Sequence, residues 1–148
     1  MYSIEEFDEQ KTKVMKYIVF KKRTEQEVRT KFRNTIEQDM LEDIIEYLKD
    51  ANYLNDKEYI EKTINNFINL KNLSLKELTY KLMTKGLNRD EIEDYMYENK
   101  DKLEKYEIES ARNIILKKQK ELEQEEIKMY LLKKGYSADC INMAFNFD

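Results

Sequence analysis

Apolar pairs recur along the chain about every fifty residues, and the two members of each pair are four positions apart. These pairs are Val28/Phe32, Leu78/Leu82 and Ile127/Leu131. Residues four apart lie on one face of an α-helix, so each pair predicts a helix with one buried face. A fixed period of this length is typical of a protein built from small repeated helical units.

Two of these three helices are preceded by a capping box, Thr24 to Glu27 and Ser74 to Glu77. In this motif the hydroxyl accepts a hydrogen bond from a free backbone N–H, and the glutamate accepts one from the N–H of the cap residue. The third copy has Glu123 in place of the hydroxyl residue. The sequence therefore predicts defined starts for the first two helices and a divergent third repeat.

A lysine–glycine turn follows the second and third of these helices, at Lys85–Asn88 and Lys134–Ser137. Each glycine is predicted to take the left-handed conformation that ends a helix. The last residue of each turn, asparagine or serine, is predicted to cap the next helix. The first repeat has Asn34 in this place, and asparagine tolerates the left-handed conformation best after glycine. We therefore expect Asn34 to substitute for the glycine.

Further apolar stripes at helical spacing precede and follow each pair, so each unit is predicted to be helix–helix–helix. The predicted fold is all-α, with three tandem three-helix repeats at 8–54, 55–100 and 101–148 in one continuous domain over 1–148. A unit of about fifty residues buries too little apolar surface to be robust alone. Neighbouring repeats are therefore expected to share contacts in an elongated, curved, solenoid-like body.

The composition supports helices and removes most catalytic chemistry. There is no proline and there are only two glycines, although strand-rich folds need both in their turns. There is no histidine and one cysteine, which removes the commonest acid–base group, the usual zinc ligands and any internal disulfide. No glycine-rich nucleotide loop is present. We expect no catalytic residue, no cofactor and no metal, and an inert, partly buried thiol at Cys140.

We expect neither a secretory signal nor a membrane span in this chain. Its first ten residues include four acidic ones, whereas a secretory signal needs a basic start followed by an apolar stretch. The apolar runs are also too short to cross a membrane. A lone cysteine suits a reducing compartment. We expect a cytoplasmic protein, monomeric and without a membrane partner.

Three segments resemble those of the RecX family. Tyr47–Ile60 is similar to the family's junction between repeats, with Asn52 where a glycine is usual. Ser74–Ile92 resembles its second-repeat signature, and Arg23–Phe32 resembles the start of its first repeat. The likeness extends over nearly the whole chain, and the order and spacing of the three segments make it specific.

This resemblance implies a bacterial regulator of homologous recombination, DNA repair and the SOS response. Members of the family bind RecA filaments on DNA, lie along the filament groove, and reduce ATP hydrolysis and strand exchange. The implied partner is therefore the RecA recombinase filament, and no cofactor is implied.

The charge is even overall but uneven locally. The net charge is −4, so the whole chain is not a typical basic nucleic-acid binder. Residues 11–33, however, hold nine basic residues against two acidic ones, and residues 36–50 hold six acidic residues against one lysine. The ordinary interpretation is a series of solvated helix faces. The functional interpretation is a basic stripe near the repeat turns that faces phosphate or an acidic protein groove, with the first-repeat patch as the best candidate.

Contacts with DNA through such a stripe would be to phosphates, and therefore sequence-independent and salt-sensitive. The candidate partner-binding or DNA-binding residues are Lys13, Lys16, Lys21, Lys22, Arg23, Arg29, Lys31, Arg33, Lys76, Lys81, Lys85, Lys117, Lys118, Lys128, Tyr130, Lys133 and Lys134.

The eleven tyrosines raise the question of base stacking. Five of them occupy apolar positions of the repeat and are predicted to pack in the core: Tyr17, Tyr53, Tyr59, Tyr95 and Tyr136. Tyr80, Tyr97 and Tyr130 lie off these stripes and are predicted to be exposed. Tyr130, between Lys128 and Lys133, is the candidate contact.

Two other functions remain open at this stage. One is a helical scaffold for another protein, with an incidental basic patch. The other is a direct DNA-binding module in which each three-helix unit acts as a helix-turn-helix domain. The second would cluster basic and amide side chains on one recognition helix, whereas here they are spread over two helices of each repeat.

Overall fold

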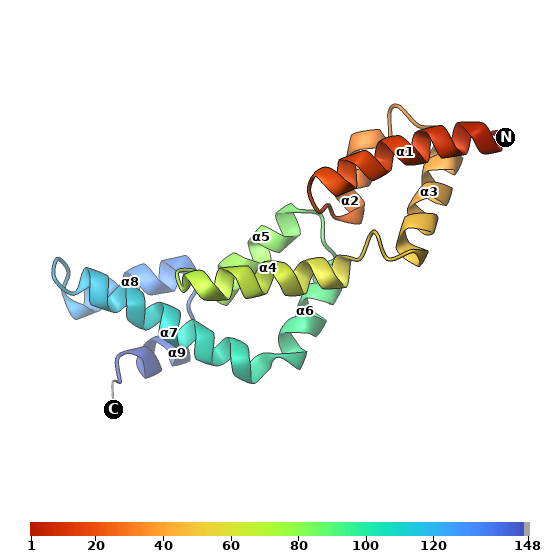
Figure 1. Ribbon diagram of the computed structural model, residues 1–148. Helices are drawn as coiled ribbons and strands as arrows, with labels where there is room; N and C mark the ends of the chain where they lie inside the picture. Colours follow the sequence, from red (N-terminus) through yellow and green to blue (C-terminus); the bar gives the residue numbers. More distant parts are fainter. Residues whose placement is uncertain (147–148) are drawn as a thin grey trace. The chain divides into compact units, whose positions relative to one another are not determined.

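The computed structural model describes residues 1–146, which form nine α-helices and no strand (Figure 1). The helices are α1 (Ile4–Phe20), α2 (Glu25–Phe32), α3 (Gln38–Asp50), α4 (Asp56–Leu70), α5 (Leu75–Thr84), α6 (Arg89–Glu98), α7 (Lys100–Lys118), α8 (Gln124–Lys134) and α9 (Ala138–Ala144). They form three consecutive sets of three, which confirms the predicted all-α class with tandem three-helix repeats. The last two residues of the predicted third repeat lie outside the described range.

The chain divides into two compact units. Unit one is Met1–Ile60 with Lys85–Leu87, and unit two is Glu61–Thr84 with the chain from Asn88 onward. In unit one, α1, α2 and α3 share one apolar core. In unit two, α7 packs against α8 and α9 around a second core (Figure 1). Among the described residues, none of the helices has the length and apolar character needed to cross a membrane.

Both predicted capping boxes are present. Thr24 Oγ1 accepts from the Glu27 N–H at 3.1 Å, and Glu27 Oε1 accepts from the Thr24 N–H at 3.0 Å. The same two bonds join Ser74 and Glu77, at 3.1 and 3.0 Å. Because two free donors are satisfied at each start, α2 and α5 begin at defined residues.

Both lysine–glycine turns also form as predicted. Gly86 has φ +81° and Gly135 has φ +106°, which is the left-handed region. The Asn88 side chain then caps α6 by accepting from two backbone N–H groups, and the Ser137 hydroxyl caps α9. The two turns therefore end one helix and start the next within a few residues.

The prediction for Asn34 was wrong. Among the described residues other than glycine, only Asn52 and Lys71 have positive φ. The chain leaves α2 through a right-handed turn instead, because Arg33 remains in the helical region and the Ile36 N–H donates to the Phe32 carbonyl at 2.9 Å. With its last carbonyls satisfied in this way, α2 needs no left-handed residue.

The three apolar pairs that set the period are all buried, which confirms the helix faces predicted for them. Tyr53 was predicted to pack in the core and is 51% exposed, so that prediction was wrong. The left-handed Asn52, with φ +63°, redirects the chain at this point. Leu54 is only 3% exposed and takes the inward position that periodicity assigned to Tyr53.

Candidate functional site

The turn after α8 is held against the first turn of α5. The Ser74 hydroxyl, which caps α5, donates to the Lys134 carbonyl at 2.8 Å and is itself fully buried. A Cβ added to Gly135 would lie 2.9 Å from the Cβ of Lys76. Only glycine allows the two backbones to approach this closely with φ +106°. The ends of α5 and α8 are thus fixed relative to each other within unit two.

A buried carboxylate fixes the same helix start from the other side. Glu107 on α7 is 7% exposed, and its Oε2 accepts from the Leu75 N–H at 2.8 Å. Burial raises the pKa of Glu107, and the hydrogen bond from Leu75 offsets part of that rise. A carboxylate at this position also satisfies a free donor at the positive end of the α5 dipole.

Two tyrosine hydroxyls complete the support beneath this turn. The Tyr106 hydroxyl donates to the Leu73 carbonyl at 2.6 Å, and the Tyr136 and Ser110 hydroxyls lie 2.6 Å apart. Burial raises the pKa of both tyrosines, so both hydroxyls stay protonated at neutral pH. The segment before α5 and the turn after α8 are therefore held by satisfied polar groups as well as by apolar packing.

A surface groove of about 480 Å³ opens between α5 and the end of α8. We call it the lysine groove, and its lining residues are Lys76, Glu77, Tyr80, Lys81, Thr84, Lys133, Lys134 and Gly135. Four lysines line it against one glutamate, so its charge is strongly positive although the whole chain carries a net −4. The structure thus brings together four lysines that lie up to 58 positions apart in the sequence and on two different helices.

Three of these four lysines are available to a ligand. Lys134 lies 3.8 Å from the Glu77 carboxylate and donates to the Asn72 carbonyl at 3.5 Å. Lys76, Lys81 and Lys133 are exposed, and no carboxylate within residues 1–146 forms an ion pair with any of them. Lys81 Nζ also lies 5.7 Å from the centre of the Phe67 ring, a contact that leaves its charge without an anionic partner. The single glutamate of the groove is occupied by Lys134 and by the α5 cap, so it does not neutralise the other three.

Two tyrosines border this surface. Tyr80 is 70% exposed at the groove, and its ring is the only aromatic one in the lining. Tyr130 does not line the groove, but Lys134, which does, has its Nζ 5.8 Å from the centre of the Tyr130 ring. Lys118 Nζ lies 4.8 Å from the same ring. As predicted, Tyr80, Tyr97 and Tyr130 are all exposed.

The first-repeat cations are less available than their number suggests. Lys22 pairs with Glu58 at 3.1 Å. Arg29 lies 3.2 Å from Glu25 and also pairs with Glu42, and the hydrogen bond from Arg29 lowers the pKa of Glu42. The Arg29–Glu42 pair holds α2 against α3, and the Lys22–Glu58 pair joins the segment before α2 to α4, so these cations are less free for a partner.

Arg23 and Lys31 gather around one ring. The Arg23 guanidinium lies 4.1 Å from the centre of the Tyr17 ring, and Lys31 Nζ lies 5.8 Å from it. Arg23 Nε is buried without a hydrogen-bond partner within residues 1–146. The part of the first-repeat patch that stays exposed consists of Lys13, Lys16, Lys21, Lys22, Lys31 and Arg33.

The other predicted residues are scattered over the two units. Lys85 is half-buried in unit one, and its carbonyl accepts from the Thr24 hydroxyl at 2.7 Å. Lys117 is exposed at the end of α7. Lys128 lies 3.6 Å from Glu125 and 5.6 Å from the Phe145 ring centre. The structure thus brings four of the predicted lysines into one groove and adds Tyr130 with Lys118 at its border.

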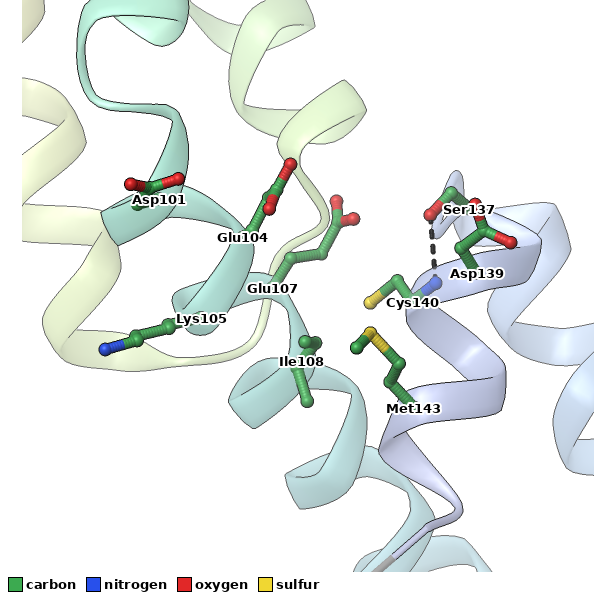
Figure 2. Close-up of a pocket in the computed structure, with 9 residues that line it drawn as sticks. All are labelled: Asp101, Glu104, Lys105, Glu107, Ile108, Ser137, Asp139, Cys140 and Met143. Atoms are coloured by element: carbon green, nitrogen blue, oxygen red, sulfur yellow. Dashed lines mark hydrogen bonds between the residues drawn. The ribbon is translucent and has the colours of Figure 1, made fainter.

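A second pocket, of about 610 Å³, lies between α7 and α9 (Figure 2). Figure 2 shows Glu107 on α7 facing Cys140 on α9. Burial and the neighbouring Glu107 raise the pKa of the Cys140 thiol to about 12. The thiol is therefore protonated at neutral pH, in keeping with the inert thiol that was expected. Among the described residues, no cluster of acidic, cysteine or histidine side chains could hold a metal ion.

Sequence reasoning missed Tyr80 and Glu107 as site residues. Glu107 follows Asp56 by about one repeat length, and both carboxylates accept from the first N–H of a helix, so the period carried a usable signal. Tyr80 follows Lys76 by four positions on the same helix face. That spacing could have linked it to the basic stripe.

No family model matches the sequence. The chain is 31% identical to the Regulatory protein RecX of Finegoldia magna over 146 residues, covering 94% of this chain and 71% of the relative. It is 30% identical to the Regulatory protein RecX of Staphylococcus carnosus over 134 residues, covering 88% of this chain. It spans 50% of that relative's length, so about half of the longer protein has no counterpart here.

The fold is similar to that of two crystal structures. A RecX structure from Lactobacillus salivarius has a TM-score of 0.83 and 24% identity, covering 97% of both chains. A structure of a regulatory protein RecX has a TM-score of 0.80 and 18% identity, covering 95% of this chain and 73% of the other. The sequence relatives and the fold agree: this chain belongs to the RecX family of regulatory proteins.

Proposed function

We propose that this protein regulates a RecA-type recombinase by binding its filament on DNA, and that the lysine groove is the main contact. Membership in a family of regulatory proteins is the observation that carries the proposal. The role in recombination, DNA repair and the SOS response is the one that the family resemblance implied. The regulator reduces ATP hydrolysis and strand exchange by occupying the filament, and it needs no cofactor.

The groove supports this choice of contact surface. Its three unpaired lysines stand on a backbone that the Ser74, Glu107 and Gly135 contacts hold in place. Preorganised charges lose less conformational freedom on binding than charges on mobile segments. The filament offers phosphates and acidic side chains, both of which a cationic groove attracts. The first-repeat patch is the secondary contact in this proposal, since part of its charge is internally paired.

The remaining expectations follow the same proposal. A regulator of a recombinase works in the bacterial cytoplasm, where the DNA is, and it acts without catalytic residues. The proposed repeats at 8–54, 55–100 and 101–148 are its structural units, and the protein binds the filament as a monomer.

Filament binding tests the proposal directly. Recombinase filaments assembled on single-stranded DNA would be sedimented with increasing amounts of this protein, and the bound fraction would be measured. The double variant Lys81→Glu, Lys133→Glu is expected to bind at least about tenfold more weakly, because two attractive charges become repulsive. Lys105→Glu, an exposed lysine on α7 away from the groove, is the matched control.

Two results would contradict the proposal. Absence of the wild-type protein from the pellet at saturating concentration would remove the recombinase as its partner. Equal binding by the double variant and the wild-type protein would keep the partner but remove the lysine groove as the contact.

A further inference from the structure

The lysine groove combines three cations that form no ion pair within residues 1–146 with an exposed aromatic ring, and this combination indicates which class of ligand it could bind. Lys76 and Lys81 lie on α5, and Lys133 lies at the end of α8, so positive charge comes from both sides. Tyr80 stands on the same stretch of α5 with 70% of its surface exposed. A ring this exposed contributes little to the core, although it lies on a helix whose other face is well packed.

Phosphate groups fit the charge of this groove, and a base fits its ring. Lysines bind phosphates as point charges without a fixed geometry. Unstacked bases present a flat face that an exposed tyrosine can cover, whichever base it is. An acidic peptide would use the lysines but would leave Tyr80 without a defined contact. A duplex would use the lysines too, but its bases are already stacked on one another.

The border of the groove extends the same pattern. Lys134 lines the groove, and its Nζ lies 5.8 Å from the centre of the Tyr130 ring. Lys118 Nζ lies 4.8 Å from the centre of the same ring. Tyr130 is 36% exposed. Lys134 therefore connects the groove lined by Tyr80 to a second tyrosine ring, and neighbouring cations and aromatic rings are typical of sites that bind a single nucleic-acid strand.

We infer that the lysine groove binds single-stranded nucleic acid directly, with its phosphates on Lys76, Lys81 and Lys133 and a base stacked on Tyr80. This inference deepens the proposed function, on which it rests for its biological setting, because it names the strand rather than the recombinase as the ligand of the groove. Binding is independent of base sequence, because no side chain of the groove is placed to read base edges in a fixed frame.

The test uses the purified full chain without any recombinase. Fluorescence anisotropy of a labelled oligo(dT) of about 16 nucleotides, the upper end of the span of one single-strand module, measures binding over a range of salt concentrations. Tyr80→Leu is expected to weaken binding about tenfold without changing the salt dependence. Lys133→Gln is expected to reduce the slope of log K against log salt by about 0.7, since one phosphate contact is lost.

Matched variants separate these effects from general damage. Tyr97→Leu removes an equally exposed tyrosine on α6 (77% exposed) and should leave binding unchanged. Lys105→Gln should leave the salt slope unchanged. Tyr80→Phe keeps the ring and should restore binding, which a variant with a damaged fold would not allow. Circular dichroism of each variant checks that the helices are intact.

The outcomes divide clearly. A duplex of the same length that binds as tightly as oligo(dT), or a Tyr80→Leu variant that binds like the wild-type protein, would overturn the inference in favour of a general charge effect. Displacement of bound, labelled oligo(dT) by polyglutamate at lower concentrations than unlabelled oligo(dT) requires would overturn the inference and assign the groove to an acidic protein segment. If oligo(dT) fails to bind while filament binding persists, this inference falls and the proposed function stands.

Discussion

The first turns of α2 and α5 are held by the same set of contacts, one in each compact unit. Thr24 donates to the Lys85 carbonyl at 2.7 Å, as Ser74 donates to the Lys134 carbonyl at 2.8 Å. The first N–H of each helix also donates to a carboxylate. The Glu25 N–H of α2 donates to Asp56 at 3.0 Å, and the Leu75 N–H of α5 donates to Glu107 at 2.8 Å. Residues 21–32 and 71–82 even share the same order of buried, half-buried and exposed positions.

The surfaces beside these two junctions differ. Gln26 stands where the second junction has Lys76, and Thr30 stands where it has Tyr80. The Gln26 side-chain amide donates to the Thr30 hydroxyl at 3.3 Å, so these two polar groups satisfy each other. The first junction therefore lacks both the extra cation and the exposed ring of the lysine groove.

This comparison separates the structural role of the repeat from its binding role. The hydroxyl and the carboxylate satisfy backbone groups that would otherwise be buried without partners. The left-handed glycine lets the turn approach the start of the other helix closely. The positions of all three are set by the repeat. The exposed positions of α2 and α5 carry no such requirement, and in unit two they are occupied by the residues that we propose bind a ligand.

The glycine turns should give the largest effects. Gly86→Ala is expected to lower the free energy of unfolding by about 3 kcal/mol, because the left-handed conformation and a severe overlap both oppose a Cβ. That Cβ would lie 2.4 Å from the Cβ of Gln26. Gly135→Ala meets Lys76 at 2.9 Å and should cost less, about 2 kcal/mol. Urea denaturation measures both, and a larger cost at Gly135 would contradict the geometry described for the two turns.

The buried hydroxyls should give the next largest effects, and similar ones at the two junctions. Thr24→Ala and Ser74→Ala each remove a helix cap and leave a lysine carbonyl without its donor, at about 1–2 kcal/mol. Thr30→Ala, at an exposed position of α2, should stay within about 0.5 kcal/mol of the wild-type protein. Thermal or urea denaturation checks this, and a loss at only one junction would show that the two are not equivalent.

The carboxylate of Glu107 should give the smallest effect, seen as a dependence on pH. Burial raises its pKa in the folded state, so the folded protein holds a proton that the unfolded chain has released. Its contribution to stability is therefore complete below the ordinary glutamate pKa and is lost as the pH rises through the raised value. Glu107→Gln stays neutral and should remove this decline from urea denaturation curves recorded across that range.

Glu104→Gln provides the control for this pH measurement. Glu104 lies on the same helix as Glu107, one turn earlier, and is exposed. The charge of Glu104 is the smallest of the contributions that raise the pKa of Glu107, so its replacement should leave most of the decline with rising pH in place. A Glu107→Gln protein with an unchanged pH profile would show that another group causes the decline.

Much of the fold could be predicted because it depends on neighbours in the sequence. Capping boxes, left-handed glycines and apolar pairs involve residues within a few positions of one another. The two wrong predictions, at Asn34 and Tyr53, concern places where the local sequence is compatible with two backbone conformations. A right-handed turn ended α2 without a left-handed residue, and the left-handed Asn52 moved the inward position from Tyr53 to Leu54.

The site could be predicted only in part, because it depends on which residues of different helices meet. The lysines of α5 and α8 were among the candidates predicted from the sequence, and the first-repeat patch was the best candidate because its excess of basic residues is largest. Counting does not reveal that Arg29 lies between Glu25 and Glu42, or that Lys22 reaches Glu58. It also does not reveal that Lys76 and Lys133 border one groove.

The central claim is regulation of a recombinase through the lysine groove, and ATP hydrolysis tests it most directly. Single-strand-dependent ATP hydrolysis by the cognate recombinase would be followed while this protein is titrated in. The account predicts suppression well below a one-to-one ratio, with the Lys81→Glu, Lys133→Glu variant needing at least about tenfold more protein and Lys105→Glu behaving like the wild type. Unchanged hydrolysis at saturating wild-type protein would contradict it.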